Sequence, residues 1–271
     1  MEVRRPEFVP DPALSREEME ALQRDIADAA TFADDPDFDS ATLIDREPGQ
    51  STLADASAGD AAAESASDTQ HVVVGVDQAF FDDRALSAVV ASRGGEVIDR
   101  AGAAVDVEIP YIPGLLSFRE GGAILAALAE LDVDPDLLVL DGSGRIHFRQ
   151  AGIATHVGVV VDCPAVGVAK SLLCGRPTRS LEDPLPEGER VPIEADERVE
   201  APARTVLGHA YQSRQYDSPN RHVNPLYVSP GHRVGVDTAT DLVAALCAGY
   251  KLPEPTRLAD SYADELKADH R

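Results

Sequence analysis

Two aspartates, each following a run of apolar residues, are the strongest chemical signal in the sequence. Asp77 ends the apolar run 72–76, and Asp141 ends the run 137–140. A carboxylate beside buried branched residues is costly to desolvate unless something binds it. If the two strands are neighbours, the two charges raise each other's pKa unless a divalent cation keeps both ionised. The alternative for Asp141 is an ordinary Asp-Gly turn with Gly142.

Four further side chains could serve the same site, and each also has a plainer explanation. Glu120 is a candidate third carboxylate, or it pairs with Ser117 in a capping box that begins a helix. His232 and His147 lie in predicted loops, where a histidine is commonly just solvated. Lys170 ends a predicted strand in a chain with three lysines, although an arginine would serve equally well on a surface. Together these groups would suit a phosphate and an activated water.

The segment 110–114, PYIPG, is a second candidate site. Two prolines, Pro110 and Pro113, stiffen it, and Tyr111 stands between them beside Ile112. A rigid loop that presents an aromatic ring can stack on bases or wedge between them. The alternative is a packed Pro-Tyr turn. The sequence has no P-loop, G-x-G-x-x-G, H-E-x-x-H or G-x-S-x-G motif, so nucleoside-triphosphate, dinucleotide and serine-hydrolase functions lose their usual support.

The elements that must position these residues read as an α/β protein. Ser15 and Glu18 form a capping box at the start of a helix predicted over 14–33. A buried strand from His71, a hairpin with its turn at Gly94-Gly95, and then helix, strand, helix and strand follow. A meander followed by alternating helices and strands predicts a mixed sheet flanked by helices. This is the order of the ribonuclease H-like fold.

Composition divides the chain into unequal parts. We expect an N-terminal helical segment packed on the core (1–33), an acidic flexible linker or insertion (34–70), a catalytic domain (71–262) and a C-terminal tail (263–271). The linker has ten acidic residues and one arginine, which cannot support a packed core. Residues 175–202 are rich in proline and acid, and predict a surface excursion. A helix capped by Thr238 and Asp241 is expected to run to about Gly249.

The net negative charge of the chain indicates a salty habitat and says little about whether the protein binds nucleic acid. The 271 residues carry a formal charge of −24, with 48 acidic and 24 basic residues and no tryptophan. Such an acidic, lysine-poor surface is typical of a halophile, where salt screens self-repulsion. Three cysteines without a C-x-x-C pair argue against a disulfide scaffold or a zinc site. The sequence shows neither a membrane span nor a signal peptide, so we expect a cytoplasmic monomer.

Five segments in order resemble the endonuclease V family. They are VGVDQAF (74–80), PYIPGLLSFREG (110–121), LDGSGRIHFRQAGIATHVGVVVDCPAVGVAKSLLCG (140–175), NPLYVSPGHRVGVDTA (224–239) and KLPEPTRLAD (251–260). The resemblance covers residues 71–260, and its most specific part is PYIPG-x-L-x-FRE. With the acidic composition, it predicts a family member from a haloarchaeon. Ser143 and Phe148 depart from the pattern, since the family often has His and Pro at these positions.

The resemblance implies Mg²⁺-dependent cleavage of the second phosphodiester bond 3′ to deoxyinosine, leaving 3′-hydroxyl and 5′-phosphate ends. Mn²⁺ is expected to substitute. Asp77, Glu120 and Asp141 match the family's metal-binding carboxylates, and His232 matches a histidine at the same site. His147 and Lys170 match residues beside the scissile phosphate. Tyr111 matches a wedge that fills the gap left by the everted base. The base pocket is implied to be backbone of the loop Pro110–Gly114, which includes Ile112 and Pro113, together with Gly142 and Gly152.

From these matches we expect Asp77 and Asp141 to hold the principal metal, with Glu120 sharing it or binding a second ion. His232 would orient or deprotonate the water, and Lys170 would stabilise the phosphate. The expected partner is DNA containing deoxyinosine. Two alternatives stay open: an inosine-specific endoribonuclease, and a non-catalytic nucleic-acid-binding protein on the same fold.

Overall fold

The computed structural model describes residues 1–35, 37–44, 71–81, 83–218 and 221–269. Within them, nine strands form one mixed sheet in the order β3-β2-β1-β4-β5-β9-β8-β7-β6. The strands are Val72–Phe81 (β1), Arg84–Arg93 (β2), Glu96–Asp106 (β3), Leu137–Asp141 (β4), Ala165–Ala169 (β5), Arg176–Pro177 (β6), Arg190–Glu194 (β7), Val206–Tyr211 (β8) and Leu226–His232 (β9). The fold is therefore ribonuclease H-like, as predicted.

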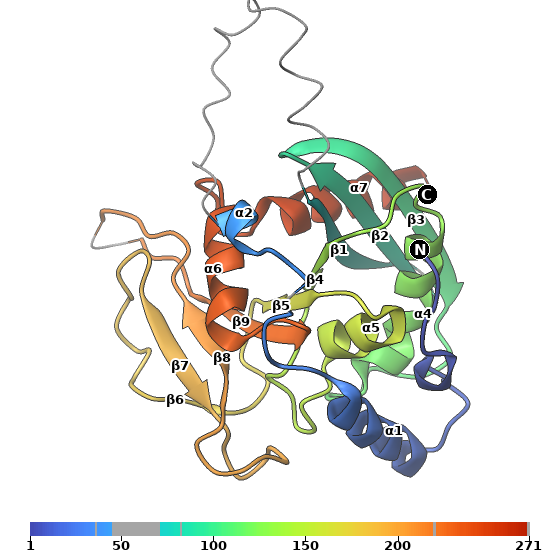
Figure 1. Ribbon diagram of the computed structural model, residues 1–271, viewed down its shortest axis with the longest axis horizontal. Coiled ribbons are helices and arrows are strands. Elements are labelled where there is room, and N and C mark those ends of the chain that lie inside the picture. Colours follow the sequence, from blue (N-terminus) through green and yellow to red (C-terminus); the bar gives the residue numbers. More distant parts are fainter. Residues whose placement is uncertain (36, 45–70, 82, 219–220, 270–271) are drawn as a thin grey trace, which may run out of the picture.

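Helices cover both faces of the sheet (Figure 1). They are Arg16–Ala29 (α1), Ala41–Ile44 (α2), Leu116–Ala129 (α4), Ile153–Val161 (α5), Val236–Leu246 (α6) and Glu254–Asp269 (α7), with a 3-10 turn at Pro6–Phe8. One core cluster joins α4 and α5 to β1, β2 and β4. A second cluster joins α2 and α6 to the opposite face of the same central strands. The predicted capping box of Ser15 and Glu18 begins α1.

The three central strands run parallel, and this sets the site. β4 pairs with β1 on one side and with β5 on the other, both in parallel. Their apolar runs are buried on both faces, as parallel strands under two helical layers require. Because the three strands run in the same direction, Asp77, the residue after the last β1–β4 pair, lies beside Asp141 at the end of β4. Lys170 follows β5 at the same edge.

Helix α7 is fixed against β1 by a close backbone approach. A Cβ atom at Gly75 would lie 1.9 Å from the carbonyl oxygen of Pro255, so only glycine fits at this point of the strand. The sequence prediction ended the domain at residue 262, whereas α7 continues to Asp269 with Ala263 buried. Residues 263–269 of the expected C-terminal tail are therefore part of a packed helix.

Two further boundaries differ from the sequence prediction. The acidic segment begins as packed structure, because Leu43 is buried in the cluster with α6 and Asp34 accepts hydrogen bonds from Gly235 and Thr238. Residues 45–70 of the predicted linker lie outside the described residues. The expected surface excursion at 175–202 contains β7, whose side chains of Val191 and Ile193 are buried. In both segments a few apolar residues at the right spacing outweigh the acidic composition.

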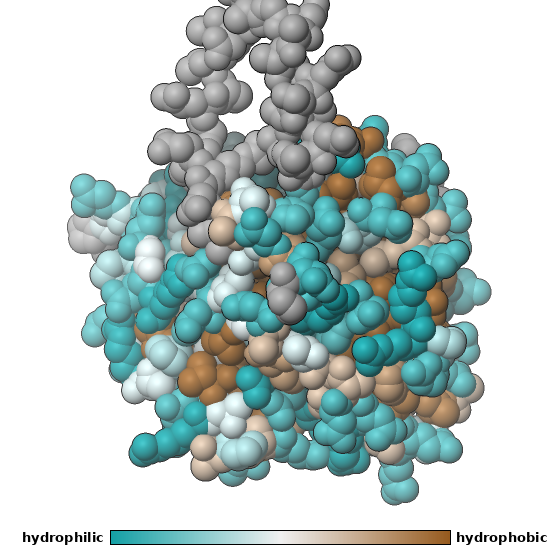
Figure 2. Space-filling model, in the orientation of Figure 1, coloured by the Kyte–Doolittle hydropathy of each residue, from teal (hydrophilic) through white to brown (hydrophobic). Residues whose placement is uncertain are grey.

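The face of the molecule in Figure 2 is mostly hydrophilic, with separate small hydrophobic areas. Tyr111 and Tyr250 are among the large side chains that stay exposed. Among the helices that the structure describes, none has the length and hydropathy needed to cross a membrane.

Candidate active site

Asp77 and Asp141 meet where the parallel pairing of β1 with β4 ends. β4 ends at Asp141, whereas β1 continues beside β2 to Phe81. The parallel register places Val76 beside Leu140, so the two aspartates are the next residues on neighbouring strands. Asp77 is 7% exposed. Burial raises the pKa of Asp77 to about 8, and the hydrogen bond and charge of Asp141 add to the shift. The predicted pairing of the two carboxylates is present in the structure.

Lys170 supplies a positive charge to this pair. It follows β5, the strand on the other side of β4, and its Nζ donates to Asp141 Oδ2 over 2.7 Å. Burial alone would lower the pKa of Lys170, but the bond to Asp141 and the charges of Asp77 and Asp260 raise it. Lys170 is therefore a charged ammonium at the mouth of the site.

Glu120 reaches the same region from α4. The helix begins at Leu116 with Leu115 as its N-cap, and no side chain caps it, so the alternative capping box of Ser117 and Glu120 is not formed. Glu120 is 5% exposed. Burial raises the pKa of Glu120 to about 7, Arg119 opposes the shift, and Asp141 adds to it. A buried carboxyl group without a capping role is free to serve as a ligand.

Asp260 is a fourth carboxylate of the site, and the sequence analysis did not single it out. Its charge raises the pKa of both Asp77 and Lys170. Pro255 of α7 lies against Gly75 of β1. From this contact α7 rises roughly 7.5 Å to Asp260, and β1 covers a similar distance to Asp77, so the two carboxylates are at the same level. The sequence did contain a signal for Asp260, because it is the last residue of the segment 251–260 that resembles the family.

The donor set of this site suits a hard divalent cation. Carboxylate oxygens are the preferred ligands of Mg²⁺. The raised pKa values of Asp77 and Glu120 show that burial and like charge work against ionisation here, which a bound cation would reverse. Across the described ranges, no three His, Cys, Asp or Glu side chains already converge on one point that could hold a metal ion. The residues nonetheless fit the group in chemistry, with Asp77 and Asp141 in contact and Glu120 and Asp260 beside them.

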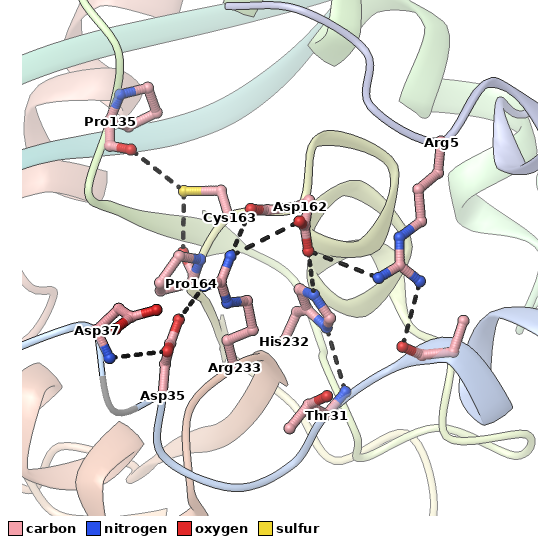
Figure 3. A network of polar contacts seen from close by, with 11 residues as sticks. Arg5, Thr31, Asp35, Asp37, Pro135, Asp162, Cys163, Pro164, His232 and Arg233 are labelled. Carbon is pink, nitrogen blue, oxygen red and sulfur yellow. Dashed lines mark hydrogen bonds and ion pairs between the residues drawn. The ribbon is translucent and has the colours of Figure 1, made fainter.

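His232 does not lie at this site, so that prediction is wrong. It pairs in register with Ala165, at the start of β5, whereas Asp141 pairs with Val168 near its end. The two ends are roughly 10 Å apart. Figure 3 shows His232 between Asp162 and Thr31: its Nε2 donates to the Asp162 carboxylate over 3.1 Å, and its Nδ1 accepts from the Thr31 amide. Its ring ties the N-terminal segment to the opposite end of the sheet.

His147 is buried beside the loop 110–114, and its expected role at the scissile phosphate stays a prediction. Its ring is 3% exposed, and its Nε2 donates to the Gly114 carbonyl over 3.0 Å while Nδ1 accepts from the Arg149 amide. Burial lowers the pKa of His147 to about 4, so the ring is neutral. The φ of Gly114 is +84°, which favours glycine. Gln23 of α1 donates to the same carbonyl over 2.8 Å, so helix and histidine together hold the loop 110–114.

A cavity of about 60 Å³ lies beside this loop. Tyr111, Ser143, Gly152 and eight further residues line it: Gln23, Gly114, Leu116, Ser117, His147, Ala151, Ile153 and Leu173. Gly142 lies against the side chain of Ile153. Tyr111 is 64% exposed, so it is not the packed turn that was the alternative. The exposed ring of Tyr111 therefore borders a small hollow that is lined by both polar and apolar side chains.

The other residues of the loop divide between solvent and core. Pro110 and Pro113 are exposed on either side of Tyr111. Ile112 instead packs against Met19 and Leu115, in the small cluster that joins α1 to the loop. Ile112 therefore anchors the loop.

The family model of endonuclease V matches residues 57–261. Endonuclease V of Haloarcula marismortui is 62% identical over 97% of both chains, and that of Halobacterium salinarum is 58% identical over 98% of this chain and all of the relative. The crystal structure of endonuclease V from Streptomyces avermitilis is 32% identical, covers 100% of this chain and 99% of its own, and has a TM-score of 0.71. That of Ciona intestinalis, 21% identical with a TM-score of 0.66, holds a 24mer DNA with an inosine followed by a ribo-adenosine; it covers 94% and 98%.

A ribonuclease H-like sheet that gathers buried carboxylates and a lysine where its parallel strands end defines a nuclease, an enzyme acting on phosphodiester bonds. The chain belongs to the endonuclease V family. Its relatives in Haloarcula, Natronomonas and Halobacterium agree with the expected haloarchaeal character.

Proposed function

We propose that this protein cuts a nucleic-acid strand at the second phosphodiester bond 3′ to a deoxyinosine, in a reaction that depends on Mg²⁺ and leaves 3′-hydroxyl and 5′-phosphate ends. The observation that carries the proposal is the contact of Asp77, Asp141 and Lys170 at one edge of the sheet, with Glu120 and Asp260 beside them. The family supports the choice of reaction, and the Ciona relative bound to inosine-containing DNA supports the choice of substrate.

In this proposal Asp77 and Asp141 hold the metal, with Glu120 and Asp260 as further oxygen ligands. When bound, Mg²⁺ supplies charge relief on the phosphate and a more acidic water. Lys170 would place its ammonium against a phosphate oxygen and shield it from the carboxylates. Because His232 lies at the other end of the sheet, no histidine is assigned to the water.

The base would enter the cavity beside Tyr111. An everted base must leave its stack, and a deaminated base in a weakened pair costs least to extract. Tyr111 would fill the gap that the base leaves. The backbone of the loop, held by Gln23 and His147 through Gly114, would meet the edge of the base.

The test is a cleavage assay on matched DNA strands with and without one deoxyinosine, in Mg²⁺, in Mn²⁺ and in EDTA. We expect cleavage of the inosine strand with either metal, and products whose ends can be identified by ligation. Equal cleavage of both strands would contradict the specificity. Undiminished cleavage in EDTA would contradict the metal requirement.

An inosine-specific endoribonuclease is the second candidate, and one observation favours it. The Ciona relative was crystallised with a ribonucleotide directly after the inosine. A 2′-hydroxyl reader would make the enzyme prefer RNA. The same assay with RNA strands of equal sequence decides between the two, because the rates can be compared directly.

A further inference from the structure

The loop that follows β8 carries two arginines, Arg214 and Arg221, that stack on one aromatic ring. The guanidinium carbons of Arg214 and Arg221 lie 5.8 and 4.2 Å from the centre of the Tyr216 ring. Arg214 also donates to the carbonyl of Gly249 over 2.8 Å. Among the described residues, no carboxylate is within ion-pair distance of either guanidinium. In a chain with twice as many acidic as basic residues, this leaves two ordered cations available to an outside anion.

Lys251 adds a third cation of the same kind. Its carbonyl accepts a hydrogen bond of 2.6 Å from Ser213 Oγ, which ties the segment before α7 to the loop after β8. Burial lowers the pKa of Lys251, and the charge of Lys170 lowers it further, so the two ammonium groups are electrostatic neighbours. Ser213 and Lys251 therefore join the loop after β8 to the segment before α7.

The topology places these cations next to the active site. β9 is antiparallel to β5 and β8 is antiparallel to β9, so β8 ends at the same edge of the sheet as β5. Ser213 and Arg214, which follow β8, are thus on the edge that carries Lys170.

The cavity and the cations lie on different sides of that edge. The residues around the cavity come largely from α4, α5 and the loops before them, on the face that those helices cover. Lys251 lies between α6 and α7, and α6 covers the opposite face. A strand that leaves its base in the cavity and crosses Asp77 and Asp141 therefore continues towards Lys251 and Arg214.

We propose that Lys251, Arg214 and Arg221 bind the sugar–phosphate backbone of the substrate strand on the 3′ side of the cleaved bond. This rests on the proposed function, in which the inosine lies 5′ of that bond. Guanidinium and ammonium groups are the usual donors to phosphate oxygens. The ring of Tyr216 holds both guanidinium groups in place before the strand arrives, which reduces the entropy lost on binding.

The experiment compares single-charge variants on strands of different length. Arg214→Gln, Arg221→Gln and Lys251→Gln each remove one cation of the proposed surface. Arg93→Gln is the matched control, because Arg93 is an exposed arginine at the opposite end of the sheet, beside Val72. Affinity is measured by fluorescence anisotropy in EDTA, for one inosine strand with a long 3′ flank and one that stops at the cleavage position. Circular dichroism selects KCl concentrations at which every variant is folded.

Each of these three variants should bind the long strand more weakly. The slope of log affinity against log[KCl] should become less steep by about 0.7 to 0.9 for each variant. For Arg214→Gln combined with Arg221→Gln, the ratio of its Kd to that of the unaltered protein should change roughly tenfold over a fourfold range of KCl. On the short strand this ratio should be near one. Loop variants that match Arg93→Gln on the long strand, or that lose as much on the short strand, would overturn the inference.

Arg221→Gln keeps the test decisive if Arg214→Gln fails to fold. Arg214 donates to the backbone carbonyl of Gly249, whereas the contact of the Arg221 side chain within the described residues is with the Tyr216 ring. A protein that neither binds nor cuts any inosine strand would contradict the proposed function. A protein that cuts inosine strands, with loop variants indistinguishable from the control, would contradict only this inference.

Discussion

At the scale of single residues, the charge state of Asp77 decides what the site can do. Its carboxyl is buried next to Asp141, and Lys170 offsets part of the negative charge from the other side of Asp141. Asn has nearly the same shape as Asp but carries no charge. Asp77→Asn should therefore leave the fold intact and abolish cleavage of an inosine strand in Mg²⁺. Initial rates and circular dichroism check this.

Asp106→Asn is the matched control, because Asp106 is an exposed carboxylate in a surface ion pair with Arg84 at the edge strand β3. It should keep the unaltered rate. Near-normal turnover of Asp77→Asn would remove Asp77 from the site.

The raised pKa of Asp77 also predicts how stability depends on pH without metal. Between its usual value and about 8, the folded protein binds the proton that the unfolded chain has lost. Stability linked to Asp77 is thus fully present at low pH and is lost as pH rises towards 8, by at most about 1.4 kcal/mol per pH unit. Asp77→Asn should flatten this decline. Urea unfolding in EDTA from acidic to alkaline pH measures it; parallel curves for both proteins would contradict the prediction.

The residues of the site differ in how far the sequence predicts them. Asp77 and Asp141 are predictable because each ends an apolar run, and parallel strands bring such ends together. Asp260 is not, because its place depends on the approach of α7 to Gly75. The prediction that His232 lies at the metal site was wrong, because the glycine-bounded sequence around it does not indicate which end of the sheet it occupies. The hydrogen bond of His147 to Gly114 is not predictable from the sequence, because it joins two loops that meet only in the folded chain.

At the scale of elements, α1 is part of the candidate base pocket. Gln23 is 1% exposed, donates to Gly114 and accepts from Arg149. Gln23→Leu would leave Arg149 without this partner and loosen the loop, so we expect a loss of about 1–3 kcal/mol in unfolding free energy. KM for an inosine strand should rise at the same time. Urea unfolding and steady-state kinetics measure the two effects.

The control for this helix is Arg24→Ala, which breaks the exposed ion pair of Arg24 with Glu200 on the same element. Such a pair contributes about 0–1 kcal/mol. If Arg24→Ala raised KM as much as Gln23→Leu, the effect would belong to α1 in general and not to the bond with Gly114.

The acidic segment gives a second prediction for an element. Residues 45–70 have a composition that supports no core, so replacing them with a Gly-Ser bridge should preserve specific cleavage. Replacing 34–70 should lower the unfolding free energy, because it also removes Leu43 from the core and Asp34 from the start of α6. Thermal unfolding and cleavage rates of the two deletions compare them. A folded but inactive deletion of 45–70 would show that this segment has a role in catalysis.

The central strands and helices were predictable because their apolar patterns are strong, whereas the peripheral elements have weak patterns and were missed. The alternation of buried strands and helices from His71 to Lys170 follows directly from apolar runs and glycine turns. β7 and the end of α7 were missed because each holds few apolar residues among acidic ones. Their burial depends on partners distant in sequence, such as Gly102, whose Cβ would meet the side chain of Leu266 at 2.3 Å.

At the scale of the whole molecule, the formal charge of −24 opposes both folding and the approach of a polyanion. The cations at Lys170, Lys251, Arg214 and Arg221 are local exceptions on an otherwise acidic chain. In molar salt the Debye length is about 3 Å, which confines repulsion to direct neighbours. Salt therefore removes the general penalty while contacts at the site persist over short distances.

Cleavage of inosine-containing DNA should consequently rise with KCl, over a range that extends to the molar scale at fixed Mg²⁺. An ordinary basic nuclease does the opposite, because each phosphate that it neutralises releases counterions. Here the gain comes from a tighter fold and weaker general repulsion, whereas the cationic contacts affect only the ratio between a loop variant and the unaltered protein. Initial rates against KCl concentration, with circular dichroism at each point, separate folding from binding. A rate that falls steadily from about 50 mM upward, where phosphate-driven binding typically weakens, would contradict the halophilic interpretation and leave the nuclease assignment untouched.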